Sequence, residues 1–135
     1  AIMDSPEVVE IRSQSDIVLV RQKVRALAVQ LGFSLVEQTK IVTAASELAR
    51  NTFDHGKGGT ATLEILDRDQ QRGLRLIFED QGAGIANVEL ALQDGYTTGK
   101  GLGLGLGGAK RLMSEFEITS EVGKGTQVKV IRWLH

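Results

Sequence analysis

The sequence predicts a two-layer α/β sandwich, in which a mixed, mostly antiparallel sheet carries helices on one face. Two stretches with helical spacing come first, at 15–31 and 34–55, and two pairs of alternating stretches follow, at 60–78 and 117–134. Strands that arrive in pairs favour hairpins over the strand–helix alternation of a doubly wound parallel sheet. Sixteen glycines against one proline are the unusual feature of the composition. Their clusters mark the candidate functional loops.

The bulk properties exclude several classes of protein. A chain of 135 residues suffices for one domain, which we expect to span 3–135, with Ala1 and Ile2 as a cloning remnant before Met3. A formal net charge of −1 gives no basic surface for nucleic acid. The absence of cysteine excludes disulfides and thiolate metal sites. No secretion signal or apolar run of membrane-spanning length is present, so we expect a cytoplasmic protein.

The first elements predicted along the chain are a short strand and a helix. The β-branched run Val8–Ile11 is typical of a strand. Ser15 with Asp16 offers an N-cap, and Gly32 is expected to end the helix. The apolar side chains of this helix share one side and are Val20, Val24, Leu27, Ala28 and Leu31.

A second helix is predicted from Ser34, which forms a capping-box pattern with Glu37, toward Gly56. Glu47 and Asn51 stand four residues apart, so they lie about 40° from one another around the helix and share a face. Lys40, Thr43 and Asp54 fall near the same stripe, and the opposite, buried side holds Ile41, Ala45, Leu48, Ala49 and Thr52. Taken alone, this polar stripe is more typical of an ordinary solvated surface than of a functional site.

Two hairpins and one further helix complete the prediction. In the first hairpin Ala61, Leu63 and Ile65 alternate with polar residues, the segment 67–73 turns, and Leu74, Leu76 and Phe78 alternate again. The second hairpin is expected to pair Glu117–Glu121 with Thr126–Leu134 around a turn at 123–125. Between the hairpins the spacing of Ala109, Leu112, Met113 and Phe116 predicts a helix.

Three glycine motifs follow the predicted strands and helices. Asp80, Gly82 and Gly84 come at the end of a strand, where a carboxylate can accept a hydrogen bond from an exocyclic amine and glycines let a flat ring approach the backbone. The run Gly99–Gly108 supplies backbone N–H groups for phosphates just before a helix. Gly123–Thr126 is the third motif. Each is also compatible with a plain turn or flexible loop.

The glycine run at 99–108 and the absence of other known strings narrow the possible nucleotide-binding folds. Gly103, Gly105 and Gly108 match G-x-G-x-x-G, but no strand leads directly into the match, so the dinucleotide-binding context fails. The phosphate loop G-x-x-x-x-G-K-[ST] is absent, as are the HRD and DFG strings of eukaryotic-type protein kinases. Any nucleotide site must therefore belong to another fold.

The order of the motifs is more specific than any one of them. A helical Glu and Asn, then Asp-x-Gly-x-Gly, then a glycine-rich lid, then Gly-x-Gly-Thr is similar to the four sequence boxes of the GHKL nucleotide-binding superfamily. Within it the chain resembles the anti-sigma factor and RsbT-type serine/threonine switch kinases of bacterial partner-switching and stressosome pathways. The resemblance extends from Ser15–Val18 to Arg132–Leu134.

The resemblance implies a role for each motif residue. Glu47 is the implied catalytic base, Asn51 the residue that holds Mg²⁺ against the phosphates of ATP, and Asp80 the adenine reader with Thr126 beside it. The remaining residues implied in ATP binding are Gly82, Gly84, Ile85, Thr98, Gly99, Lys100, Gly101, Leu102, Gly103, Leu104 and Gly105. Ala83 departs from the proline often found in such sequences, and the lid is unusually rich in glycine.

The resemblance also implies partners. The favoured substrate is a STAS-domain antagonist protein, phosphorylated on serine or threonine in an ATP- and Mg²⁺-dependent reaction. The alternative is a nucleotide-gated binding module that captures a sigma factor or a PP2C-type phosphatase regulatory domain. No nucleic acid or membrane partner is expected, and a homodimer stays open.

Overall fold

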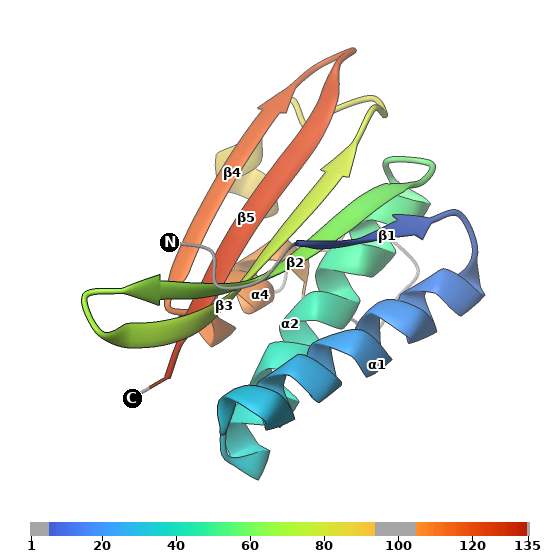
Figure 1. Cartoon of the computed structure of the whole chain (residues 1–135). Helices are drawn as coiled ribbons and strands as arrows, with labels where there is room; N and C mark the ends of the chain where they lie inside the picture. Colours follow the sequence, from blue (N-terminus) through green and yellow to red (C-terminus); the bar gives the residue numbers. More distant parts are fainter. Residues whose placement is uncertain (1–5, 94–104, 135) are drawn as a thin grey trace.

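One layer of the molecule is a five-stranded sheet with strand order β1-β2-β3-β5-β4, and the long helices lie on one side of it (Figure 1). The computed structural model describes residues 6–93 and 105–134. All neighbouring strands of this sheet pair antiparallel. The elements are β1 (Glu7–Ile11), α1 (Gln14–Leu31), α2 (Leu35–Asp54), β2 (Gly59–Arg68), β3 (Gln71–Asp80), α3 (Val88–Ala91), α4 (Gly105–Leu112), β4 (Glu115–Glu121) and β5 (Gly125–Trp133). The predicted fold class is confirmed.

Helix α1 begins two residues earlier than the sequence pattern suggested. Its N-cap is Ser13, and Asp16 lies within the first turn. The Asp16 carboxylate accepts hydrogen bonds from the Arg12 amide at 2.8 Å and the Ser13 hydroxyl at 3.2 Å. The predicted N-cap at Ser15 and Asp16 is therefore wrong, because Asp16 reaches back from inside the helix. The end at Gly32 is confirmed, since that residue has a φ of 94°.

Helix α2 has the predicted capping box and the predicted buried side. The Glu37 amide donates to Ser34 Oγ at 3.2 Å, and the Ser34 amide donates to Glu37 Oε1 at 3.3 Å. These bonds satisfy amides that lack partners at a helix start. The side facing α1 and the sheet buries the predicted residues Ile41, Ala45, Leu48, Ala49 and Thr52. The opposite stripe is thereby left for polar side chains.

The β2–β3 hairpin is longer than predicted because its turn is shorter. The pairing continues to Arg68 and Gln71, so that only Asp69 and Gln70 form the turn. Both have positive φ, 53° and 67°. Two-residue turns of this kind match the right-handed twist of the strands they join. The predicted turn at 67–73 is therefore too long. A two-residue turn made of Asp69 and Gln70 lacks the glycine that usually marks such turns in a sequence.

The helix after the glycine-rich run ends at Leu112, and Phe116 lies in β4. Its prediction as a helical residue is wrong. The Ser114 amide donates to Ile131 O at 2.8 Å, which starts the pairing with β5, and Phe116 then lies opposite Val130. Phe116 packs against the core from the strand. The spacing of the apolar residues is compatible both with a helix that continues to Phe116 and with a helix that ends before a strand.

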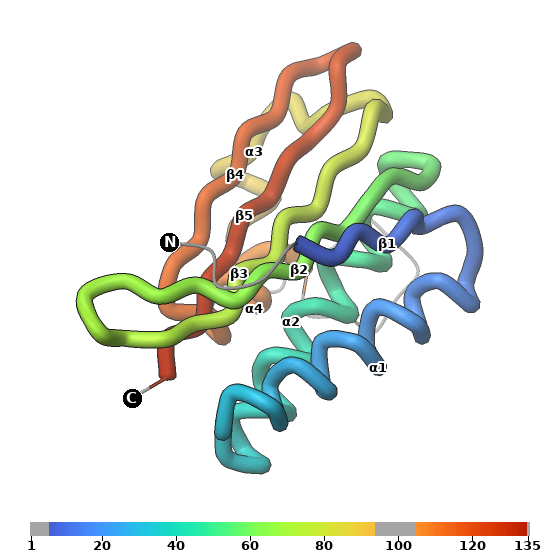
Figure 2. The backbone as a smooth tube through the Cα atoms, viewed as in Figure 1, coloured from blue at the N-terminus to red at the C-terminus, as the bar shows by residue number. Residues whose placement is uncertain are grey.

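The sheet has an inner face toward the helices and an outer face away from them. Leu63, Leu76 and Val130 lie in one row of the inner face and are buried in the main core. The outer face has a smaller buried cluster of Leu66, Ile131 and Trp133. In Figure 2, β3 and β5 run side by side through the middle of the sheet, with α1 and α2 together on one side. Among the described residues, no helix has both the length and the apolar character needed to cross a bilayer.

Candidate functional site

Three polar residues stand in one row across the inner face at the end of the sheet. Asp80 is the last residue of β3 and lies opposite Thr126 of β5, which lies opposite Ser120 of β4. Directly opposite residues of antiparallel strands point their side chains to the same face. The predicted proximity of Thr126 to Asp80 is therefore found in the sheet register.

The loop after β3 is held close to this row. The Gly82 amide donates to Asp80 Oδ1 at 2.9 Å, which fixes the carboxylate while leaving it further lone pairs. A Cβ on Gly56, at the end of α2, would lie 2.3 Å from Asp80 Cγ, so only glycine allows this approach. Gly84 has a φ of +77°, and a Cβ there would meet Glu121 O at 2.3 Å. Gly56 thus lets the end of α2 approach Asp80, and Gly84 lets the loop approach the end of β4.

Ser120 connects the row to the loop, and sequence reasoning did not identify it. Its Oγ accepts a hydrogen bond from the Ile85 amide at 2.8 Å and lies 2.7 Å from Thr126 Oγ1. It also donates to Gly125 O at 3.2 Å. The available signal was its position in the predicted hairpin, six residues before Thr126 around a glycine turn. This spacing identifies the contact between Ser120 and Thr126 only when the pairing register of β4 and β5 is known.

Glu47 and Asn51 stand on α2, both half-buried. Glu47 Oε2 accepts a hydrogen bond from the Gly105 amide at 3.3 Å, the first residue of α4. The C-terminal half of α2 and the start of α4 are thus in direct contact. The predicted lid residues Thr98–Leu104 lie outside the described residues. Of the predicted run Gly99–Gly108, residues 105–108 are described, and they form the first turn of α4.

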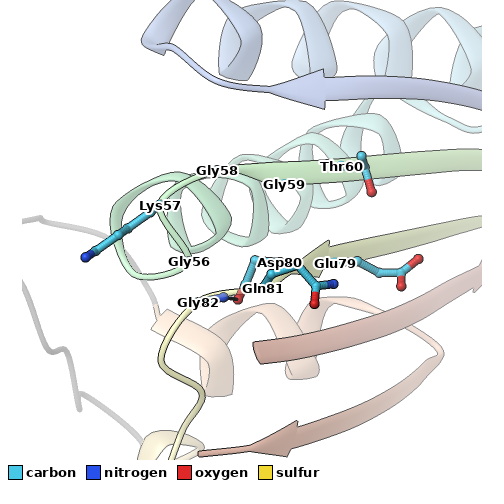
Figure 3. A pocket seen from close by; sticks show the side chains of 9 residues that line it. All are labelled: Gly56, Lys57, Gly58, Gly59, Thr60, Glu79, Asp80, Gln81 and Gly82. Carbon is cyan, nitrogen blue, oxygen red and sulfur yellow. Dashed lines mark hydrogen bonds between the residues drawn. The ribbon is translucent and has the colours of Figure 1, made fainter. Parts of the chain in front are cut away.

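A pocket of about 430 Å³ opens beside Asp80 and Gly82. Figure 3 shows its lining, with the Lys57 side chain extending away from Asp80. Thr60 and Glu79 lie opposite one another on the outer face, so the pocket opens at the end of β2 and β3 and extends to the face opposite to Thr126. Of the row Asp80, Thr126 and Ser120, only Asp80 lines the pocket. Its complete lining is Gly56, Lys57, Gly58, Gly59, Thr60, Glu79, Asp80, Gln81 and Gly82.

The polar side chains on α2 suit a metal ion that arrives together with a ligand. Among the described residues, no group of three or more histidines and carboxylates could hold a metal ion. Asn51 offers one neutral amide oxygen on the same helix face as Glu47. Mg²⁺ commonly takes one or two protein oxygens and completes its shell with phosphates and water. This donor set therefore fits Mg²⁺ bound together with a nucleotide.

The comparison with protein families gives the class of the protein. Residues 36–134 match the model of the histidine kinase-, DNA gyrase B-, and HSP90-like ATPases. The chain belongs to this ATPase family, which confirms the GHKL resemblance and implies that it binds ATP.

Individual relatives narrow the class. The chain is 45% identical to the serine/threonine-protein kinase RsbT of Bacillus subtilis, over 98% of this chain and 99% of the relative. It is 35% identical to an anti-sigma F factor of Clostridium kluyveri, over 80% of this chain and 79% of that protein. This protein is thus an RsbT-like homologue with an ATPase domain.

Solved structures support the fold. The crystal structure of RsbU and RsbW domains from Mycobacterium tuberculosis matches with a TM-score of 0.65 and 20% identity, over 96% of this chain and 32% of that one. The mycobacterial sensor histidine kinase MprB matches with a TM-score of 0.57 and 14% identity, over 96% and 97% of the two chains. At these identities the likeness concerns the fold alone.

Proposed function

We propose that this protein is a cytoplasmic, ATP-dependent serine/threonine kinase that phosphorylates a STAS-domain antagonist protein in a partner-switching pathway. The observation that carries the proposal is the position of Glu47. Glu47 lies one helical turn before Asn51 on α2. Its carboxylate oxygen is 3.3 Å from the Gly105 amide nitrogen, at the first residue of α4. A carboxylate there stands where the predicted phosphate lid leads into α4. The 45% identity to a serine/threonine-protein kinase supports the same reaction.

Glu47 acts as the general base in this proposal. Its carboxylate accepts the proton of the substrate serine or threonine hydroxyl as that oxygen attacks the terminal phosphoryl group of ATP. Phosphoryl transfer depends mainly on positioning and on neutralising charge, so one oriented carboxylate suffices for the proton. The Gly105 amide keeps the carboxylate directed toward the start of α4.

The remaining predicted residues bind the nucleotide. Asp80 and Thr126 receive the adenine, and Gly82, Gly84 and Ile85 shape the backbone beside it. Asn51 holds Mg²⁺ through its amide oxygen, and the ion when bound neutralises charge on the phosphates. The residues Thr98–Leu104 cover the phosphates with backbone N–H groups, which favour anions at the start of a helix. Gly105 begins that helix, and its own amide donates to Glu47.

A nucleotide-gated binding module is the second candidate function. In this case the protein captures a sigma factor or the regulatory domain of a PP2C-type phosphatase, and ATP controls the capture. The observation in its favour is the 35% identity to an anti-sigma F factor. The presence of Glu47 favours the kinase, because a binding module needs no base.

The deciding experiment is a transfer assay. The protein is incubated with labelled ATP, Mg²⁺ and each STAS-domain protein encoded beside its gene, with Glu47→Gln as the matched control. We expect label on a serine or threonine of one of these proteins and none with the control. Nucleotide-dependent binding of a sigma factor or phosphatase domain without any transfer would support the binding module instead.

A further inference from the structure

The Ser120 hydroxyl is surrounded by three hydrogen-bonding groups, and their chemistry fixes the direction of each bond. The Ile85 amide can only donate, and the Gly125 carbonyl can only accept. Ser120 has one proton. If that proton goes to Gly125 O, at 3.2 Å, then the 2.7 Å contact with Thr126 Oγ1 must use the Thr126 proton. This arrangement satisfies all three contacts.

The opposite arrangement satisfies fewer groups. If Ser120 donated to Thr126, its oxygen would still accept from the Ile85 amide, but the contact with Gly125 O would contain no proton. A half-buried network at the end of a sheet is more stable when each short contact is a hydrogen bond. The Thr126 proton is therefore directed at Ser120, and its remaining lone pairs are left for other partners.

We infer that Ser120 is a positioning residue that makes Thr126 a hydrogen-bond acceptor toward the purine. The inference rests on the proposed nucleotide site, because Thr126 lies opposite Asp80 on the inner face. Asp80 is an acceptor when ionised, so the two side chains present acceptors side by side. An exocyclic amine carries two N–H groups and can donate one to each. A purine with hydrogen at that position donates none.

The test compares ATP with purine riboside triphosphate, which lacks only the exocyclic amine. Competition against a fluorescent ADP analogue gives both dissociation constants for wild type, Ser120→Thr and Ser120→Val. Threonine and valine have the same shape and differ by the hydroxyl. We expect Ser120→Thr to keep the preference for ATP and Ser120→Val to reduce it about three- to tenfold, the size of one neutral hydrogen bond.

A double-variant cycle separates this role from a structural one. In a Thr126→Val background there is no hydroxyl to orient, so Ser120→Val should leave the nucleotide preference unchanged. Thr119→Val, at the neighbouring exposed position of β4, is the surface control. Melting temperatures identify any variant that fails to fold, and Ser120→Ala then replaces Ser120→Val.

Three outcomes contradict the inference or the function beneath it. An equal loss of affinity for both nucleotides in Ser120→Val would make Ser120 a structural support of Ile85. An effect on preference that persists with Thr126→Val would exclude action through the Thr126 proton. Wild-type protein that binds neither nucleotide would instead overturn the proposed function, and the two failures are thus distinguishable.

Discussion

The two faces of the sheet use polar side chains in different ways. On the outer face, Arg75 Nη2 donates to Glu64 Oε2, and Glu64 is only 5% exposed. There the charges neutralise one another. At the end of the inner face, Asp80 and Thr126 are hydrogen-bonded to the protein yet keep acceptor capacity. The outer-face charges are thus paired within the protein, whereas the inner row retains acceptors that the proposed nucleotide could use.

The largest expected effect concerns Glu47, the proposed base on α2. Glu47→Ala should slow phosphoryl transfer by roughly 10²- to 10⁴-fold and leave nucleotide affinity nearly unchanged, because a base acts on the attacking hydroxyl. Titration calorimetry beside the transfer assay separates the two quantities. Equal losses of binding and turnover would indicate a structural role for Glu47.

The second effect tests the inner row itself. Asp80→Asn should weaken ATP binding about ten- to a hundredfold and narrow the preference for ATP over GTP, since an amide can turn its donor toward the guanine carbonyl. Competition of both nucleotides against a fluorescent ADP analogue measures this. Asp54→Asn, on an exposed residue at the end of α2, is the control. An unchanged ATP/GTP ratio would mean that another group reads the base.

The sequence predicted those parts of the molecule whose causes are local. The capping box of Ser34 and Glu37 and the end of α1 at Gly32 depend on residues a few positions apart. Glu47 and Asn51 could be paired because helix geometry alone puts them on one face. Asp80 and Thr126 are 46 positions apart, by subtraction of their residue numbers, and family resemblance rather than spacing brought them together.

The features that sequence reasoning missed depend on long-range register. Ser120 has a role because β4 pairs with β5 so that it faces Thr126 and meets the Ile85 amide. Phe116 was assigned to a helix because its spacing fits either structure, and pairing opposite Val130 decides for a strand. Neither pairing is encoded in a window of the sequence short enough for a periodicity to show it.

The third effect is expected on the outer face. Arg75→Met keeps the length of the side chain but leaves the Glu64 carboxylate buried without its cation, which should cost about 2 kcal/mol of unfolding free energy, the size of a hydrogen bond to a charged group. Urea denaturation measures it, and ATP affinity should not change. The double variant with Glu64→Leu should recover most of the loss, because it removes the unpaired charge. A double variant as unstable as Arg75→Met would contradict this account.

The fourth effect returns to the site. Asn51→Ala removes the amide oxygen proposed to hold Mg²⁺, so the tightening of ADP binding by Mg²⁺ should fall by about tenfold, the size of one contact with a charged group. ADP affinity with and without Mg²⁺ gives the result. Lys40→Ala, an exposed position on the same helix, is the control. A response to Mg²⁺ equal to that of wild type would exclude Asn51 as a ligand.

The smallest effect tests whether the two faces are independent. Arg68 lies 4.8 Å above the ring of Trp133 and 3.2 Å from Glu115, whose carboxylate also accepts the Trp133 indole N–H at 2.7 Å. Arg68 is about half exposed, so Arg68→Gln should cost only about 0.5 to 1 kcal/mol and lower the melting temperature by about 2 to 4 °C. Trp133 is the one tryptophan in the sequence, so its fluorescence reports this face directly. Arg68→Lys is the charge-preserving control and should lose less stability.

We expect the ATP affinity of Arg68→Gln to stay within about twofold of wild type, because substitutions without shared contacts act additively. A larger change in ATP affinity would show that the outer cluster and the inner row are energetically coupled through the strands between them.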